Sequence, residues 1–193
     1  MRQRVYSDGS IQRWNCDLLD RFLNWVNVEL RGNPKAISRI GFGNYPNPLL
    51  EYSGYGCFVP ANTIHFINEG GHEEHQLLDI GEGFGDHSPI VTSLISGGMN
   101  TVVAPNLETF IRLGTTYGFG VGVFGAPSIE QLQIRELKGT NLEFAKRLAK
   151  EVLGSYSPIE ELEVRTVIRE SHTKYQDHMQ PALEGDSSNP DRL

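Results

Sequence analysis

The clearest pattern in the chain is a run of apolar residues spaced as on one face of an α-helix. The pattern begins after Asp17, a residue suited to capping a helix, and ends at Gly32 and Pro34, which stop one. It therefore predicts a helix over residues 17–32. The residues that form the stripe are Leu19, Phe22, Leu23, Val26 and Leu30.

The pattern changes between residues 55 and 104, where short runs rich in β-branched residues alternate with glycine-rich turns. Short turns favour antiparallel pairing, because a parallel crossover needs a dozen or more residues. An Asp8-Gly9 pair near the start also predicts a hairpin between residues 4–6 and 11–14. The predicted sheet strands cover residues 56–59, 63–67, 76–80, 90–94 and 101–104.

Helical signals return after Pro105. Asn106 is placed to cap a helix over residues 107–114, and three later segments match the reciprocal capping pattern at a helix start: 128–131, 140–143 and 157–160. The order of elements predicts an α+β fold, with a central, mostly antiparallel sheet flanked by N-terminal and C-terminal helices. We expect one domain over residues 1–180 and a disordered tail over 181–193.

Composition narrows the class of protein. No apolar run approaches 18 residues, and the basic N-terminus leads into polar residues, so we expect neither a membrane span nor a signal peptide. Two cysteines, Cys16 and Cys57, fit a reducing, cytoplasmic compartment. A net charge of −7 argues against nucleic-acid binding and suits a basic protein partner. The oligomeric state stays open, with a homo-oligomer among the alternatives.

The strongest candidate for a metal site is the segment His72-Glu73-Glu74-His75, with His65 and His87 nearby. Two imidazoles with a third ligand could hold zinc and support a metal-dependent hydrolase. However, His72 and His75 are three residues apart and lead into a predicted strand. In a strand, two side chains three residues apart point to opposite faces. We therefore expect no metal and keep the hydrolase as the alternative.

Other catalytic patterns are weaker. Residues 120–125 match G-x-G-x-x-G but lack the preceding strand of a dinucleotide site, which leaves a nucleotide binder as a remote alternative. There is no G-x-S-x-G elbow, and Cys57 lies in an apolar run. We expect no catalytic residue, no cofactor and no enzymatic activity.

Acidic residues are concentrated between residues 69 and 86, a stretch without Lys or Arg. If these carboxylates share a surface, they would steer a basic partner toward it. The candidate partner-binding residues are Glu69, Glu73, Glu74, Asp79, Glu82 and Asp86.

The segment 70–79, GGHEEHQLLD, resembles the Gly-Gly-Asp-Gly-x-His-Phe-x-x-Leu segment of the SUKH superfamily, which includes fungal cell-wall-synthesis regulators. Residues 88–91, 100–114, 117–118, 129–132 and 144–153 continue the resemblance, while His72 replaces the usual Asp. The resemblance implies an α+β fold and a non-enzymatic role. It implies either an immunity protein that neutralises a nuclease or deaminase toxin, or a regulatory scaffold.

Overall fold

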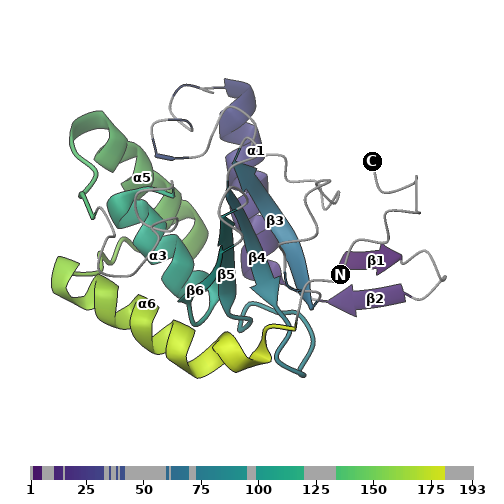
Figure 1. Cartoon of the computed structure of the whole chain (residues 1–193). Coiled ribbons are helices and arrows are strands. Elements are labelled where there is room, and N and C mark those ends of the chain that lie inside the picture. Colours follow the sequence, from purple (N-terminus) through teal and green to yellow (C-terminus); the bar gives the residue numbers. More distant parts are fainter. Residues whose placement is uncertain are drawn as a thin grey trace.

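A four-stranded antiparallel sheet lies at the centre of the protein, with helices packed around it, in a computed structural model of the chain (Figure 1). The predicted α+β fold is therefore confirmed. The structure describes residues 2–5, 11–14, 16–32, 35, 38, 40–41, 60, 62–69, 73–94, 99–119 and 134–180. The predicted strand 56–59, the predicted helix start at 128–131 and the tail 181–193 lie outside these residues.

Neighbours in the sheet are also neighbours in sequence, as short connections require. The order is β3-β4-β5-β6, and the predicted N-terminal hairpin forms a separate two-stranded sheet. The strand predicted over 76–80 begins at Glu73 in the structure, three residues before its predicted start, and ends at Leu78. The side chain of the next residue, Asp79, forms a turn. The strands are β1 Arg2–Val5, β2 Ile11–Trp14, β3 Thr63–Glu69, β4 Glu73–Leu78, β5 Ile90–Leu94 and β6 Met99–Ala104.

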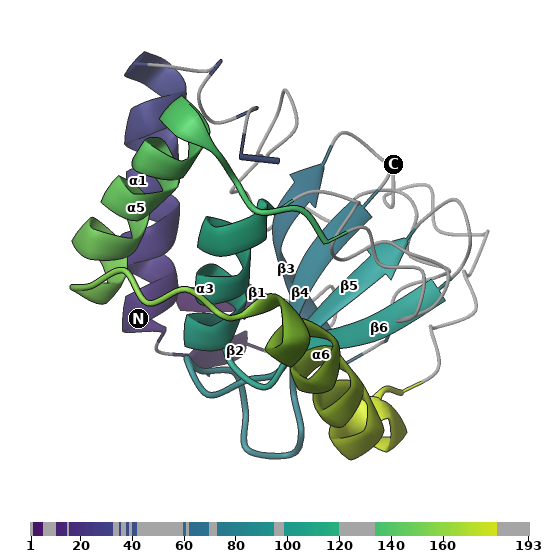
Figure 2. The same cartoon turned by 90° about the vertical axis from the view of Figure 1, so that its left-hand side faces the viewer.

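Three helices cover one face of the sheet, and the last helix lies beside β6 (Figures 1 and 2). Helix α1 lies where it was predicted but already includes Asp17, and Asn106 caps α3 as predicted, since its Oδ1 accepts the Thr109 amide at 2.9 Å. The helices are α1 Asp17–Gly32, α3 Leu107–Tyr117, α5 Gly139–Leu153 and α6 Glu161–Tyr175, followed by the 3₁₀ turn η4 Gln176–His178. No helix in these ranges is both long and apolar enough to cross a bilayer.

The main core lies between the sheet and the three helices α1, α3 and α5. Its centre is a group of fully buried rings. The Phe110 ring is 5.6 Å from Phe66 of the sheet and 5.5 Å from Phe119, which in turn is 5.7 Å from Phe22 of α1. These contacts join β3, α1 and α3 through aromatic packing.

The opposite face of the sheet carries a smaller apolar cluster and a diagonal row of polar residues. Leu78, Val91 and Val102 pack against Tyr175 of α6. In the polar row, the Gln76 amide accepts from Thr63 and donates to Ser93 Oγ at 2.9 Å, and Ser93 donates to Asn100. Each strand of the sheet thus contributes one residue to a hydrogen-bonded row. The four residues are Thr63, Gln76, Ser93 and Asn100.

The reciprocal capping predicted at 140–143 and 157–160 is wrong. Helix α5 begins one residue earlier than Thr140, and neither α5 nor α6 has a side-chain cap. Tertiary hydrogen bonds explain the late start of α6. The Arg112 Nε donates to Ser157 O at 3.0 Å, and the Tyr117 hydroxyl donates to Ile159 O at 2.6 Å. These bonds use groups that a helix would need and keep the chain extended before Glu161.

Helix α6 is joined to β6 through a histidine. The Val102 amide, on the strand's outer side, donates to His172 Nδ1 at 3.3 Å. Burial lowers the pKa of His172, which favours the neutral ring that this acceptor role requires.

Candidate functional site

The six acidic residues predicted to form one surface are divided between the two ends of β4. Glu69 ends β3, while Glu73 and Glu74 begin β4, so their backbones lie at the β3–β4 turn. Asp79, Glu82 and Asp86 follow β4 at its other end. A strand of six residues separates its ends by about 17 Å. The six residues are therefore not one patch.

Asp86 holds the start of helix α1. Its carboxylate accepts the Leu18 amide at 3.0 Å and the Leu19 amide at 3.3 Å, and its backbone oxygen accepts the amide of Leu107 at 3.3 Å. The predicted cap, Asp17, instead forms the first residue of the helix. One residue thus secures the starts of both α1 and α3, and its charge is used within the fold.

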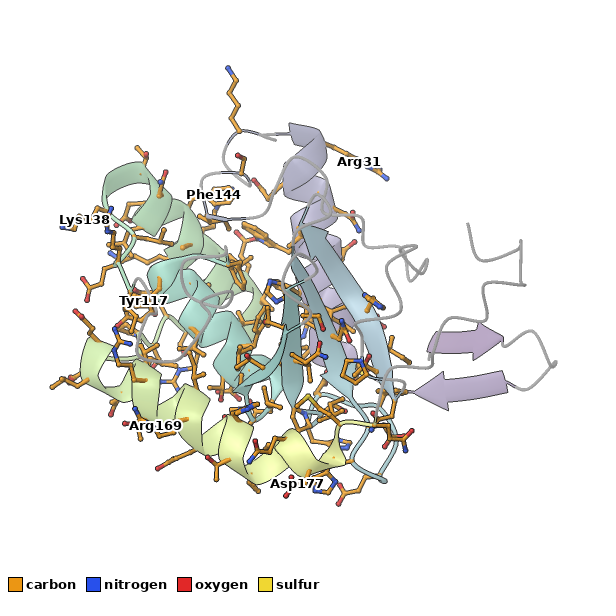
Figure 3. All side chains as sticks on the ribbon, in the orientation of Figure 1. Arg31, Tyr117, Lys138, Phe144, Arg169 and Asp177 are labelled. Carbon is orange, nitrogen blue, oxygen red and sulfur yellow. The ribbon has the colours of Figure 1, made fainter. Side chains whose placement is uncertain are left out.

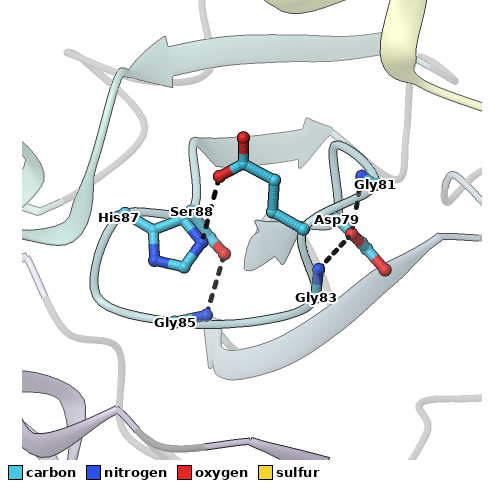
Figure 4. A network of polar contacts seen from close by, with 7 residues as sticks. Asp79, Gly81, Gly83, Gly85, His87 and Ser88 are labelled. Atoms are coloured by element: carbon cyan, nitrogen blue, oxygen red, sulfur yellow. Dashed lines mark hydrogen bonds and ion pairs between the residues drawn. The ribbon is translucent and has the colours of Figure 1, made fainter.

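Asp79 has a similar internal role in the loop after β4. Its Oδ1 accepts the amides of Gly81 at 2.8 Å and Gly83 at 2.9 Å (Figure 4). Both glycines have positive φ, 96° and 77°, a conformation that other residues rarely adopt. Asp79 therefore shapes the loop, as aspartates commonly do in turns.

The remaining acid of this loop, Glu82, is exposed, and its Oε2 lies 3.9 Å from Nε2 of His87 (Figure 4). Ser88 Oγ accepts the Gly85 amide at 3.0 Å in the same loop. Of the three acids in this loop, Asp79 and Asp86 accept backbone amides, whereas Glu82 is exposed beside His87.

The histidines of the metal hypothesis are not brought together. His75 is fully buried, with Nδ1 2.9 Å from Thr92 Oγ1 and Nε2 3.3 Å from Phe119 O. His65 lies on the opposite face of the sheet, because it alternates with core residues of β3, and His87 lies in the loop beyond β4. His72 is outside the described residues. Within the described part of the chain, no group of three potential ligands could hold a metal ion.

His75 has the electrostatics of a core residue. Burial lowers its pKa to about 4, and the bond to the Phe119 carbonyl offsets only part of this effect. Its ring is 5.0 Å from the Phe110 ring. The imidazole is therefore neutral at physiological pH and links strands β4 and β5 to the end of α3.

A groove of about 590 Å³ lies between α3 and α6. Ile159, Val167 and Tyr175 contribute apolar surface, while Arg112 and Glu163 add charges. Leu162 lines the groove and is 87% exposed. Burying this leucine side chain against a partner would contribute about 1.5–3 kcal/mol.

The N-terminal end of α6 is acidic. Burial and then the nearby carboxylates of Glu136 and Glu161 raise the pKa of Tyr117 to about 12. Figure 3 shows Tyr117 near this end of α6. Glu160, which also acts on Tyr117, and Glu163 are exposed, so Glu160, Glu161 and Glu163 form a set of three carboxylates next to Leu162 in the sequence. We call this set, together with Leu162, the α6 acidic end.

The sequence patterns used above did not point to Leu162, although a signal for it exists. The buried residues of α6 recur as one stripe: Val164, Ile168, Ser171 and Tyr175. Leu162 lies off this stripe, among three glutamates, so an apolar residue outside the amphipathic pattern marks the exposed position.

No protein-family model, no curated protein and no solved structure matches this chain. The resemblance to the SUKH superfamily stays a prediction.

Proposed function

We propose that this protein is a non-enzymatic binding module that engages a basic partner protein through the α6 acidic end. The single observation that carries the proposal is Leu162, which is 87% exposed, lines the α3–α6 groove and stands between Glu161 and Glu163 in the sequence. An apolar anchor next to a groove gives affinity, and the surrounding charges give steering and select against acidic competitors.

The proposed contact differs from the acidic turns suggested by the sequence. Asp79 and Asp86 accept hydrogen bonds within the fold, whereas Glu160, Glu161 and Glu163 are exposed and adjacent to Leu162. Glu69, Glu73 and Glu74, at the β3–β4 turn, remain a second candidate for steering the partner.

A toxin-neutralising immunity protein is the form of this function that we favour, with a regulatory scaffold as the runner-up. The support is the SUKH resemblance together with the net charge of −7, which suits the basic cleft of a nuclease or deaminase. A cytoplasmic location belongs to the same proposal, because a chain with only two cysteines has no disulfide framework of the kind that secreted domains use.

The test compares variants as bait in extracts of the native cell. Leu162→Asp should lose a basic protein that the unaltered chain retains. Val28→Asp is the matched control, because Val28 is also exposed (59%) but belongs to α1. Retention of the same proteins by Leu162→Asp, or no specific retention by the unaltered chain, would refute the proposed surface.

Charge reversal then locates the steering residues. Reversing Glu160, Glu161 and Glu163 should weaken capture more at low salt than at high salt. Reversing Glu73, Glu74 and Glu82 tests the acidic turns in parallel, and a larger loss from this second set would move the contact to the sheet.

A further inference from the structure

Helix α6 has an uneven distribution of charge along its length. Its N-terminal end carries Glu160, Glu161 and Glu163, whereas the remainder carries three basic residues against one acid. The backbone dipole of a helix is also positive at the N-terminus and negative at the C-terminus. Two such helices side by side in opposite directions would therefore attract each other through both side chains and dipoles. The later charges are Arg165, Arg169, Lys174 and Glu170.

The outward residues of α6 are complementary to themselves in one antiparallel register. Glu163 and Lys174 are both exposed and line the groove. They are eleven residues apart, which corresponds to about 16 Å along the axis. A twofold axis can cross the outward face of α6 midway between them, at the height of residues 168 and 169. It then places Glu163 of each copy level with Lys174 of the other.

The same register gives Leu162 an apolar partner. Lys174 Nζ lies 4.7 Å from the centre of the Tyr175 ring, and because that ring is buried against the sheet, the methylene stem of the lysine is the apolar surface that α6 exposes at this level. Leu162 of the second copy falls opposite this surface. The exposed leucine is then covered by contacts that also bring the opposite charges together.

We propose that the α6 face and its groove bind a second copy of this chain, in a twofold-symmetric dimer with antiparallel α6 helices. A twofold contact uses the same residues on both copies, so the Glu163–Lys174 pair forms twice. One helix pair with its flanking residues buries less than the roughly 1,200 Å² of a standard interface, which implies a weak dimer.

This inference uses Leu162 as a contact residue, as the proposed function does, and in that respect rests on it. The dimer covers Leu162, so self-association and partner binding exclude each other. Partner binding would therefore shift the chain from dimer to monomer.

The test measures molar mass by sedimentation equilibrium over a range of concentrations, for Glu163→Lys and Lys174→Glu separately and as an equimolar mixture. Each variant alone places like charges opposite each other twice and should dimerise at least about tenfold more weakly than the unaltered chain. In the mixture, both pairs become opposite in charge, so a heterodimer should form. Glu143→Lys and Lys146→Glu are the matched controls, because this exposed pair lies on α5, and they should leave the dimer unchanged.

A chain that stays monomeric up to about 1 mM, where even an interaction of about −4 kcal/mol would be half formed, would overturn the inference. A dimer that is indifferent to the two charge reversals would overturn it as well. Neither result affects the capture experiment with Leu162→Asp and Val28→Asp, so the proposed function can succeed or fail independently.

Discussion

Gly114 of helix α3 lies directly against the ring of Phe119, and a Cβ added at Gly114 would overlap the ring atoms. The chain therefore turns back on the helix at a position where only glycine fits. Gly118, with φ of 92°, donates its amide to Gly114 O at 2.8 Å and makes the turn. Phe119 is fixed in the aromatic core by this close approach.

Gly114→Ala should destabilise the protein, although alanine is the better helix former by about 1 kcal/mol. Displacing the Phe119 ring from a packed core should cost about 1–3 kcal/mol net. The control is Gly32→Ala at the end of α1, where nothing lies within 4 Å of the added atom, and it should be neutral or stabilising. Urea unfolding of both variants measures the difference, and a stabilised Gly114→Ala would contradict the packing described here.

Asp86→Ala should lower the free energy of unfolding by about 1–2 kcal/mol, because it removes the acceptor for two amides at the start of α1. Asp17→Ala should cost only a few tenths of a kcal/mol, since Asp17 interacts with the helix dipole alone. Glu82→Ala, at an exposed position, is the control for loss of a carboxylate. Equal losses of stability from Asp17→Ala and Asp86→Ala in thermal unfolding would contradict the assignment of Asp86 as the residue that caps α1.

Stability should fall as the pH decreases from about 6.5 to about 4, because His75 must gain a proton inside the core. Its folded pKa, about 4, is below its ordinary value, so the unfolded chain binds more protons in this window. The neutral His75 therefore contributes about 3 kcal/mol to the free energy of unfolding above pH 6.5, and this contribution is lost as the pH falls toward 4.

His75→Gln should reduce this pH dependence, measured as the urea midpoint at successive pH values. His172, whose pKa is also lowered, accounts for a remainder of the same sign. His87→Gln, at an exposed position, is the control and should follow the unaltered chain. If His75→Gln retains the full dependence, the buried imidazole is not its source.

Gln76 and Ser93 should be energetically coupled, because they belong to one buried hydrogen-bonded row. Gln76→Met and Ser93→Ala together should differ from the sum of the single changes by about 0.5–3 kcal/mol. Combining Gln76→Met with Ser157→Ala, at an exposed site on another element, should be additive within about 0.5 kcal/mol. If the changes in free energy of unfolding for Gln76→Met and Ser93→Ala were simply additive, the two residues would not be coupled through the row.

Local patterns predicted the elements whose signals are local. The stripe of α1, the Asn106 cap of α3, the hairpin at Asp8-Gly9 and the antiparallel sheet each depend on spacing or turn chemistry within a few residues. Strand β4 was displaced in the prediction because Glu73 and Glu74 are polar, and their pairing depends on neighbouring strands.

The predictions that were wrong share one physical cause. The hydrogen-bond partners of a side chain can lie far away in sequence, where a local pattern does not show them. Ser157 matches a cap pattern, yet Arg112 occupies its carbonyl oxygen, and Asp86 looks like surface charge but caps a helix 68 residues earlier. For the candidate site, the sequence gives the charge of residues 160–163, but only the packed helix shows that Leu162 is exposed.

The contact between His172 and Val102 has a consequence for self-association of another kind. The outer margin of a terminal strand can recruit foreign strands, which is how sheet proteins begin to form fibres. At Val102 the imidazole already occupies the amide that an incoming strand would require. At this position of β6, therefore, a histidine from the last helix protects the edge of the sheet against pairing with another chain. Many proteins use proline or lysine for the same purpose.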